Sequence, residues 1–282
     1  MNNPKSKILI FLALTIVLCL FTWVPILRSG DIVMGGGMYI LATMWCPGVA
    51  AIITRLVTQG NAKGMGWIPR TVPLLGLAYI LPLIYAAPVY LATWGLGLGG
   101  FDPSKWQLEQ GMSPAVGLML TATMGAVMGL VSATGEEIGW RGLLVPELAK
   151  IASFRTTALV SGVIWASFHF PLMIGANYRG EGTPLVYSML CFTVMIVALS
   201  VIMAWITLRS GSLWPAALLH GTHNLFVQAV FDRATVNGPE TAWITGEFGF
   251  GLAVTIAIAA ALLLHFGGVP ETGPKALPVE GK

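Results

Sequence analysis

The sequence predicts an all-α, polytopic integral membrane protein, and three features of the chain support this class. Of its 282 residues, 56% are hydrophobic and only 10% are charged, whereas soluble domains carry about 25% charged residues. Mean hydropathy is +0.79. Several apolar runs also reach the roughly 20 residues that a helix needs to cross the hydrocarbon core of a bilayer. We therefore expect one membrane domain, residues 1–282, surrounded by lipid.

Eight apolar segments are long enough to be transmembrane helices. They are residues 8–27, 34–57, 72–97, 113–135, 156–175, 184–208, 212–231 and 247–266. Between the fourth and fifth segments, residues 141–153 place Leu143, Leu144, Leu148 and Ile151 at helical spacing, which predicts a short interfacial helix. The tail, residues 267–282, is rich in proline and glycine and is expected to be mobile.

The first segment begins like a secretory signal peptide, with a basic start before an apolar stretch. However, the apolar stretch Ile8–Leu27 is longer than the roughly 7–15 residues of a signal h-region, and no A-x-A cleavage site follows it. We interpret this segment as a retained first span.

The basic residues favour an orientation with both termini in the cytoplasm. Eight spans and an inner N-terminus place eleven basic residues on the inner side: Lys5, Lys7, Arg55, Lys63, Arg70, Arg141, Lys150, Arg155, Arg209, Lys275 and Lys282. Four fall on the outer side: Arg28, Lys105, Arg179 and Arg233. Because cytoplasmic loops carry an excess of Lys and Arg, we expect a multi-pass protein of the cell membrane with cytoplasmic N- and C-termini.

Charge and cysteine content exclude other classes of protein. The net charge of +3 is small and no basic run is present, so nucleic acid is not an expected partner. Cys19, Cys46 and Cys191 lie in apolar segments without CxxC spacing, so no disulfide framework is expected. The sequence does not indicate an oligomeric state.

Polar side chains are concentrated in the fourth, fifth and seventh spans or at their ends. They are Glu136, Glu137, Arg141, His169, His220, His223 and Asn224. Ionisable residues inside a membrane are costly, face the protein interior and commonly mark a functional site. We therefore predict a buried polar site formed by these three spans. His265 lies at the end of the last span and is expected at the interface.

Helix geometry separates the two adjacent glutamates. Glu137 and Arg141 are four residues apart, so they share a helix face and can form an ion pair. Glu136 is turned about 100° away from Glu137 and is expected to have no partner in its own helix. A carboxylate without a counter-charge suits a general base or acid. We therefore expect Glu136 to perform chemistry and the other two residues to hold the helix.

The same spacing relates the residues of the other two spans. His220 and Asn224 are four residues apart and share a face, while His223 is near that face and is expected to support the site or to pack against a neighbouring helix. Trp165 lies four residues before His169, so its ring can form a wall beside the histidine and exclude water.

Two chemistries remain open from these residues alone. In the first, Glu136 takes a proton from a water that His169 orients, while His220 and Asn224 donate to an oxyanion. In the second, Glu136, His169 and His220 bind zinc with an open position for water, although no HExxH motif is present. Both serve hydrolysis. A proton-coupled transporter also buries Glu and His, but the sequence shows no matching broken helices in two halves.

Three motifs resemble those of the CPBP family, which unites the type II CAAX prenyl endopeptidases with the bacterial Abi proteins of bacteriocin processing and self-immunity. The segment EEIGWR (136–141) resembles the family's EExxxR motif, and WASFH (165–169) resembles an aromatic residue four positions before a histidine. HGTHN (220–224) resembles HxxxN. Phenylalanine is commoner than tryptophan at position 165. The resemblance covers about residues 113–232, the motif-bearing core.

The resemblance implies an intramembrane glutamic endopeptidase with eight helices and a cavity that opens toward the cytoplasm and the bilayer. It implies that Glu136 activates water, that His169 and His220 assist, and that Asn224 with a histidine stabilises the oxyanion. Glu137 and Arg141 match the structural pair of the family.

No cofactor is implied, with zinc as the alternative. The expected partner is a peptide or membrane-protein substrate. A non-proteolytic immunity or peptide-binding protein that uses the same pocket is the other alternative.

Overall fold

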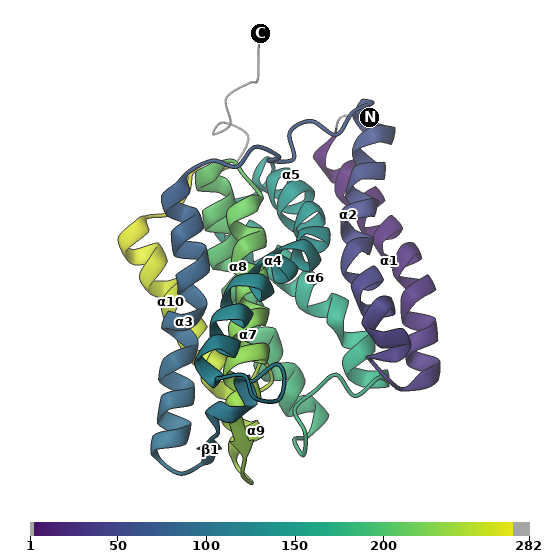
Figure 1. Ribbon diagram of the computed structural model, residues 1–282. Coiled ribbons are helices and arrows are strands. Elements are labelled where there is room, and N and C mark those ends of the chain that lie inside the picture. The colour runs from purple at the N-terminus through teal and green to yellow at the C-terminus, as the bar shows by residue number, and fades with distance from the viewer. Residues whose placement is uncertain (1–2, 273–282) are drawn as a thin grey trace.

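The computed structural model describes residues 3–272 and is almost entirely helical (Figure 1). Within this range, seven helices are long and apolar enough to cross a membrane. They are α1 (Pro4–Ser29), α2 (Met38–Gln59), α3 (Val72–Gly95), α4 (Pro114–Gly139), α6 (Phe154–Gly175), α7 (Leu185–Ser210) and α10 (Phe250–Gly267). The predicted all-α, polytopic membrane class is confirmed. Residues 273–282 of the predicted mobile tail lie outside the described residues.

Short elements connect these helices. They are η1 (Met34–Gly37), β1 (Gly99–Phe101), η2 (Pro103–Trp106), η3 (Trp140–Leu144), α5 (Val145–Ala149), β2 (Thr235–Asn237) and α9 (Thr241–Ile244). Strands β1 and β2 pair antiparallel, with Gly100 opposite Val236. We call the end of the bundle that carries this strand pair the sheet end. The opposite end, where α1 begins and α2 ends, is the amino-terminal end.

The seventh predicted span is divided into two kinds of helix. Helix α8 (Trp214–Asn224) continues directly into a π-helix, η4 (Leu225–Asp232). The run begins beside the α2–α3 connection, where the amide of Leu213 donates to the Gly66 carbonyl over 3.1 Å. It ends beside the strand pair, where the amide of Asp102 donates to the Ala234 carbonyl over 2.8 Å. The run therefore passes from one end of the bundle to the other, and the count of eight spans stays a prediction.

Most of the segment after α4 is buried, although Ile151 is exposed, so the predicted interfacial helix is not found as a separate surface helix. Helix α4 continues through the π-helix η3 into α5, and the side chains of Leu143 and Leu144 are fully buried. Glu147 is also buried, with its carboxylate 3.0 Å from the Arg55 guanidinium. The helical spacing of the leucines reflects contact with other helices rather than with the membrane surface.

Glycines allow α4 to approach two neighbouring helices closely. A Cβ atom on Gly139 would lie 2.6 Å from the Cβ atom of Pro47 in α2, and one on Gly129 would lie 2.6 Å from the carbonyl oxygen of Gly221 in α8. Small residues permit close packing of membrane helices in this way. The backbone around Glu136 is therefore held between α2 and α8.

Candidate active site

A cavity of about 310 Å³ lies inside the bundle and collects the predicted site residues. Glu136 from α4, His169 from α6, and His220 and Asn224 from α8 all line it. The predicted meeting of the fourth, fifth and seventh spans is therefore found. The cavity extends toward the sheet end, because Tyr178 in the α6–α7 connection also lines it.

Glu136 is bound by two tryptophans. Its Oε2 atom accepts hydrogen bonds from the indole nitrogen of Trp140 over 3.1 Å and from that of Trp165 over 2.7 Å. Because Trp140 is on the same helical run, the expectation that Glu136 has no partner in its own helix is wrong. Both donors are uncharged, and Glu136 is only 2% exposed. Its carboxylate is therefore oriented without being neutralised.

Glu137 has the ion pair that its spacing predicts. Its Oε1 atom lies 3.0 Å from the Arg141 guanidinium and 2.9 Å from Nδ1 of His220. The Arg141 guanidinium also lies over the Trp165 ring, 4.3 Å from its centroid. An ionised carboxylate only accepts hydrogen bonds, so Nδ1 of His220 carries a proton. The contact between Glu137 and His220 connects α8 to α4. Nε2 is the remaining polar atom of the His220 ring.

The His169 ring is fixed in its tautomer by its own helix. Its Nδ1 atom lies 2.9 Å from the Trp165 carbonyl oxygen, and since a carbonyl only accepts, Nδ1 must donate. Nε2 is then the atom with a free lone pair. The Trp165 ring is edge-on to the His169 ring, with centroids 6.3 Å apart, which agrees with its predicted position beside the histidine. The Tyr178 ring stacks on the same imidazole, also with centroids 6.3 Å apart.

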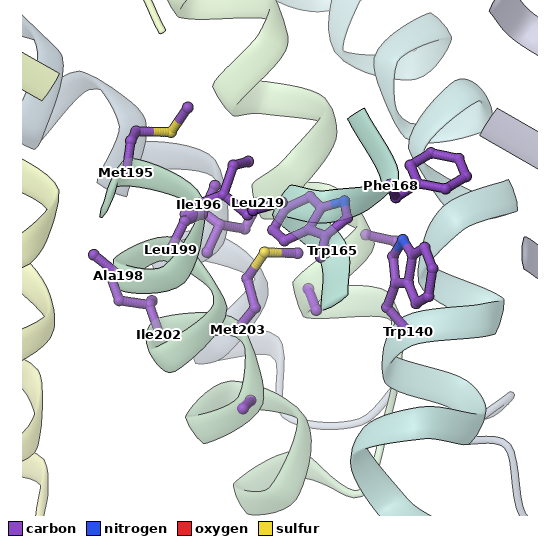
Figure 2. Close-up of a cluster of buried hydrophobic side chains, with 14 of the residues drawn as sticks. Trp140, Trp165, Phe168, Met195, Ile196, Ala198, Leu199, Ile202, Met203 and Leu219 are labelled. Atoms are coloured by element: carbon purple, nitrogen blue, oxygen red, sulfur yellow. The ribbon is translucent and has the colours of Figure 1, made fainter. Parts of the chain in front are cut away.

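The Trp140 and Trp165 rings are themselves held by apolar side chains (Figure 2). Trp165 belongs to the same cluster of buried side chains as Leu199 and Met203 of α7. Trp140 packs edge-on against Phe168, with ring centroids 5.5 Å apart. Both tryptophans are almost completely buried. The donors that orient Glu136 are therefore rigid parts of the core.

His223 belongs to a second polar group in the same cavity. Its Nδ1 atom lies 2.8 Å from the Tyr85 hydroxyl, and its Nε2 atom lies 3.3 Å from the carboxylate of Glu247. Glu247 precedes α10, lines the cavity and accepts a hydrogen bond from the Tyr178 hydroxyl over 2.9 Å. Tyr178 and Glu247 were not predicted from the sequence. The only signal was an acidic residue at the first position of the last apolar segment, 247–266.

The arrangement suits the activation of water by a carboxylate. It offers a carboxylate bonded only by neutral donors, two imidazoles with defined orientation and the amide of Asn224. Within residues 3–272, no three His, Cys, Asp or Glu side chains are grouped as metal ligands would be. The zinc ligand set Glu136, His169 and His220 is not assembled, so we derive no step through a metal.

Comparison with known proteins supports the motif resemblance. Residues 118–226 match the family model for Rce1-like type II CAAX prenyl endopeptidases, and this range contains all three motifs. A protein of Methanococcus maripaludis, CAAX prenyl protease 2, is 30% identical over 165 residues. This match covers 55% of the present chain and 55% of the relative, so the chain spans about half the length of that relative. Tyr85 and Glu247 lie outside the family-model match.

The buried pair of Glu137 and Arg141 predicts a large stability effect. Arg141→Met leaves a buried carboxylate without its cation, and breaking such a pair costs about 3–5 kcal/mol. The thermal unfolding midpoint in detergent should fall well below that of the matched Arg155→Met variant, because Arg155 is exposed. The double variant Glu137→Gln/Arg141→Met should regain most of the loss. Equal unfolding midpoints for Arg141→Met and Arg155→Met would contradict the role of this pair.

Proposed function

The chain belongs to the CPBP family, and from that premise we propose that it is an intramembrane endopeptidase in which Glu136 activates water. The observation that carries the proposal is the position of Glu136 in the cavity, where two indole N–H groups hold its carboxylate and no cation neutralises it. Such a carboxylate can take a proton. Glu137 is unsuited to this step because Arg141 and His220 occupy it.

In the proposed reaction, Glu136 takes one proton from a water molecule as the water oxygen bonds to the scissile carbonyl carbon. Nε2 of His169 accepts a hydrogen bond from the same water and orients it. When the tetrahedral intermediate breaks its C–N bond, the protonated Glu136 returns the proton to the leaving nitrogen. General base and acid catalysis of this kind contributes about 10²–10⁴-fold to a rate.

His220 and Asn224 are placed to stabilise the oxyanion. The Asn224 amide can donate directly, and His220 can donate from Nε2 when both ring nitrogens carry protons. Glu137 accepts from Nδ1 at 2.9 Å and so stabilises the protonated ring. Donors directed at a developing oxyanion are commonly the largest single contribution to catalysis.

We propose a substrate that is a peptide or a membrane-associated protein. The relative named CAAX prenyl protease 2 makes a prenylated CAAX peptide a suitable first probe. A second, almost wholly apolar groove of about 620 Å³ on α4 and η4 also reaches Asn224. Because its residue Met124 is 65% exposed, this groove faces the surroundings of the bundle and favours a substrate with an apolar, membrane-embedded part.

We also propose that both termini are cytoplasmic. The basic residues Lys5, Lys7, Lys63 and Arg70 lie at the amino-terminal end, whereas the cavity extends toward the sheet end. With cytoplasmic termini, the end of the bundle toward which the cavity extends faces away from the cytoplasm. This orientation conflicts with the cytoplasmic opening that the family resemblance implies, so an orientation measurement decides between them.

Glu136→Gln tests the proposed base, because glutamine keeps an oxygen acceptor for both indoles but cannot take the proton. Cleavage of a farnesylated CAAX peptide or of a mixed peptide library by the purified protein should fall about 10²–10⁴-fold. The exposed Glu109 provides a matched control as Glu109→Gln, which should keep full activity. An unchanged rate in Glu136→Gln would contradict the proposed base, whereas an absence of cleavage by the wild-type protein would favour the non-proteolytic, peptide-binding alternative.

We propose that no metal takes part in the reaction. Saturating EDTA or 1,10-phenanthroline should therefore leave the cleavage rate unchanged. Loss of activity on chelation, restored by added zinc and accompanied by stoichiometric bound zinc, would support the zinc alternative instead.

Cysteine labelling tests the orientation. Lys105 and Lys63 are exposed at opposite ends, and the three native cysteines are buried. A membrane-impermeant maleimide should label Lys105→Cys in intact cells and Lys63→Cys only after lysis. The unsubstituted protein should stay unlabelled in both. The reverse pattern would contradict cytoplasmic termini and place the sheet end, toward which the cavity extends, on the cytoplasmic side.

A further inference from the structure

The buried glutamates of the bundle are neutralised unequally. Glu137 is paired with Arg141 at 3.0 Å, and Glu147 with Arg55 at 3.0 Å. The two glutamates that line the cavity, Glu136 and Glu247, have no Lys or Arg within 4 Å among the described residues, and none lines the cavity. The mechanism explains why Glu136 is left without a cation. It does not use Glu247.

Glu247 is held in the cavity wall at the sheet end. Its side chain is nearly buried, with the residue 7% exposed. The Tyr178 hydroxyl donates to Oε2 over 2.9 Å, and Nε2 of His223 lies 3.3 Å from Oε1. A carboxylate has about four acceptor positions, so these two contacts leave acceptor capacity free.

The hydrogen bond of Tyr85 indicates that His223 is uncharged. Tyr85 is 2% exposed, and within the described residues the only hydrogen-bond partner of its hydroxyl is Nδ1 of His223, at 2.8 Å. A buried hydroxyl needs an acceptor for its proton, so Tyr85 donates and Nδ1 accepts. The proton of His223 is then on Nε2, which lies 3.3 Å from the Glu247 carboxylate without the geometry of a hydrogen bond. The two side chains that contact the Glu247 carboxylate, Tyr178 and His223, are therefore uncharged, as are the two donors to Glu136.

An ionised carboxylate that is buried without a counter-charge costs free energy. A cation that enters the cavity would remove this cost and gain a charge-assisted hydrogen bond. Building on the proposed function, we propose that Glu247 is a specificity residue that binds an ammonium or guanidinium group of the substrate. The ligand is then a Lys or Arg side chain, or a free α-amino group, of the peptide that is cleaved.

This subsite adjoins the catalytic residues. Tyr178 donates to Glu247 and its ring stacks on His169, so one side chain joins the two parts of the cavity. Both carboxylates line the same 310 Å³ space. A substrate whose scissile bond is at Glu136 would therefore present its cation within a few residues of that bond.

Binding to full-length protein in detergent tests the subsite separately from catalysis. Glu136→Gln serves as the background, so that no turnover occurs. The probes are ten-residue fluorescent peptides of Ala and Leu that carry one Lys at each position in turn, each matched by a norleucine peptide and a Glu peptide. N-acetylated and free forms of each peptide distinguish a side-chain cation from the α-amino group.

We expect at least one lysine position, or the free amino terminus, to bind about tenfold more tightly than its neutral match, and the Glu peptide to bind more weakly than both. Adding Glu247→Gln should abolish the preference. Glu181→Gln, which removes an exposed carboxylate in the neighbouring α6–α7 connection, should retain it. If Glu247→Gln does not fold, the affinities measured with the Glu136→Gln protein alone still test the cation subsite. The Lys peptide should bind most tightly, the norleucine peptide less tightly and the Glu peptide most weakly.

Equal binding of the Lys and norleucine peptides at every position, or a preference that survives Glu247→Gln, would overturn the subsite. So would an absence of binding by every peptide. If Lys-dependent binding is found but the wild-type protein cleaves none of the peptides, the subsite stands and the proposed proteolysis fails.

Discussion

The structure depends on one contrast between adjacent residues of α4, because Glu137 is neutralised and Glu136 is not. Arg141 and His220 both bind Glu137, which connects α4 to α8 and sets the orientation of one imidazole. Trp140 and Trp165 bind Glu136 through uncharged N–H groups, which connects α4 to α6. The same two residue positions therefore fix the three helices of the site and leave one carboxylate able to accept a proton.

The packing of α4 makes this contrast possible. The glycines of α4 bring its backbone against α2 and α8, and the cavity lies beside this junction. Trp165 takes part in both halves of the contrast, because its indole N–H donates to Glu136 while its ring lies under the Arg141 guanidinium. A cation over an aromatic face is attracted to it. The neutral and the charged parts of the site thus share one rigid side chain.

Spacing within one helix was enough to predict the Glu137–Arg141 pair and the common face of His220 and Asn224. It also places Trp140 four residues after Glu136, but an indole in an apolar run gives no sign that its N–H is used. Glu247 could not be assigned because its partners, Tyr178 and His223, come from other parts of the chain. The π-helices η3 and η4 have no sequence signal of their own, yet η3 begins within the first motif and η4 directly follows the third. Short π-helical turns are frequent at functional sites.

The central claim is that Glu136 acts through water rather than by attacking the substrate itself. A single turnover in H₂¹⁸O with enzyme in excess tests this directly, with mass spectrometry of the product and of the enzyme peptide that contains Glu136. General base catalysis places ¹⁸O in the new carboxyl terminus of the product and none in Glu136. Incorporation of ¹⁸O into Glu136 with an unlabelled product would contradict the account, because it would require a covalent acyl-glutamate intermediate.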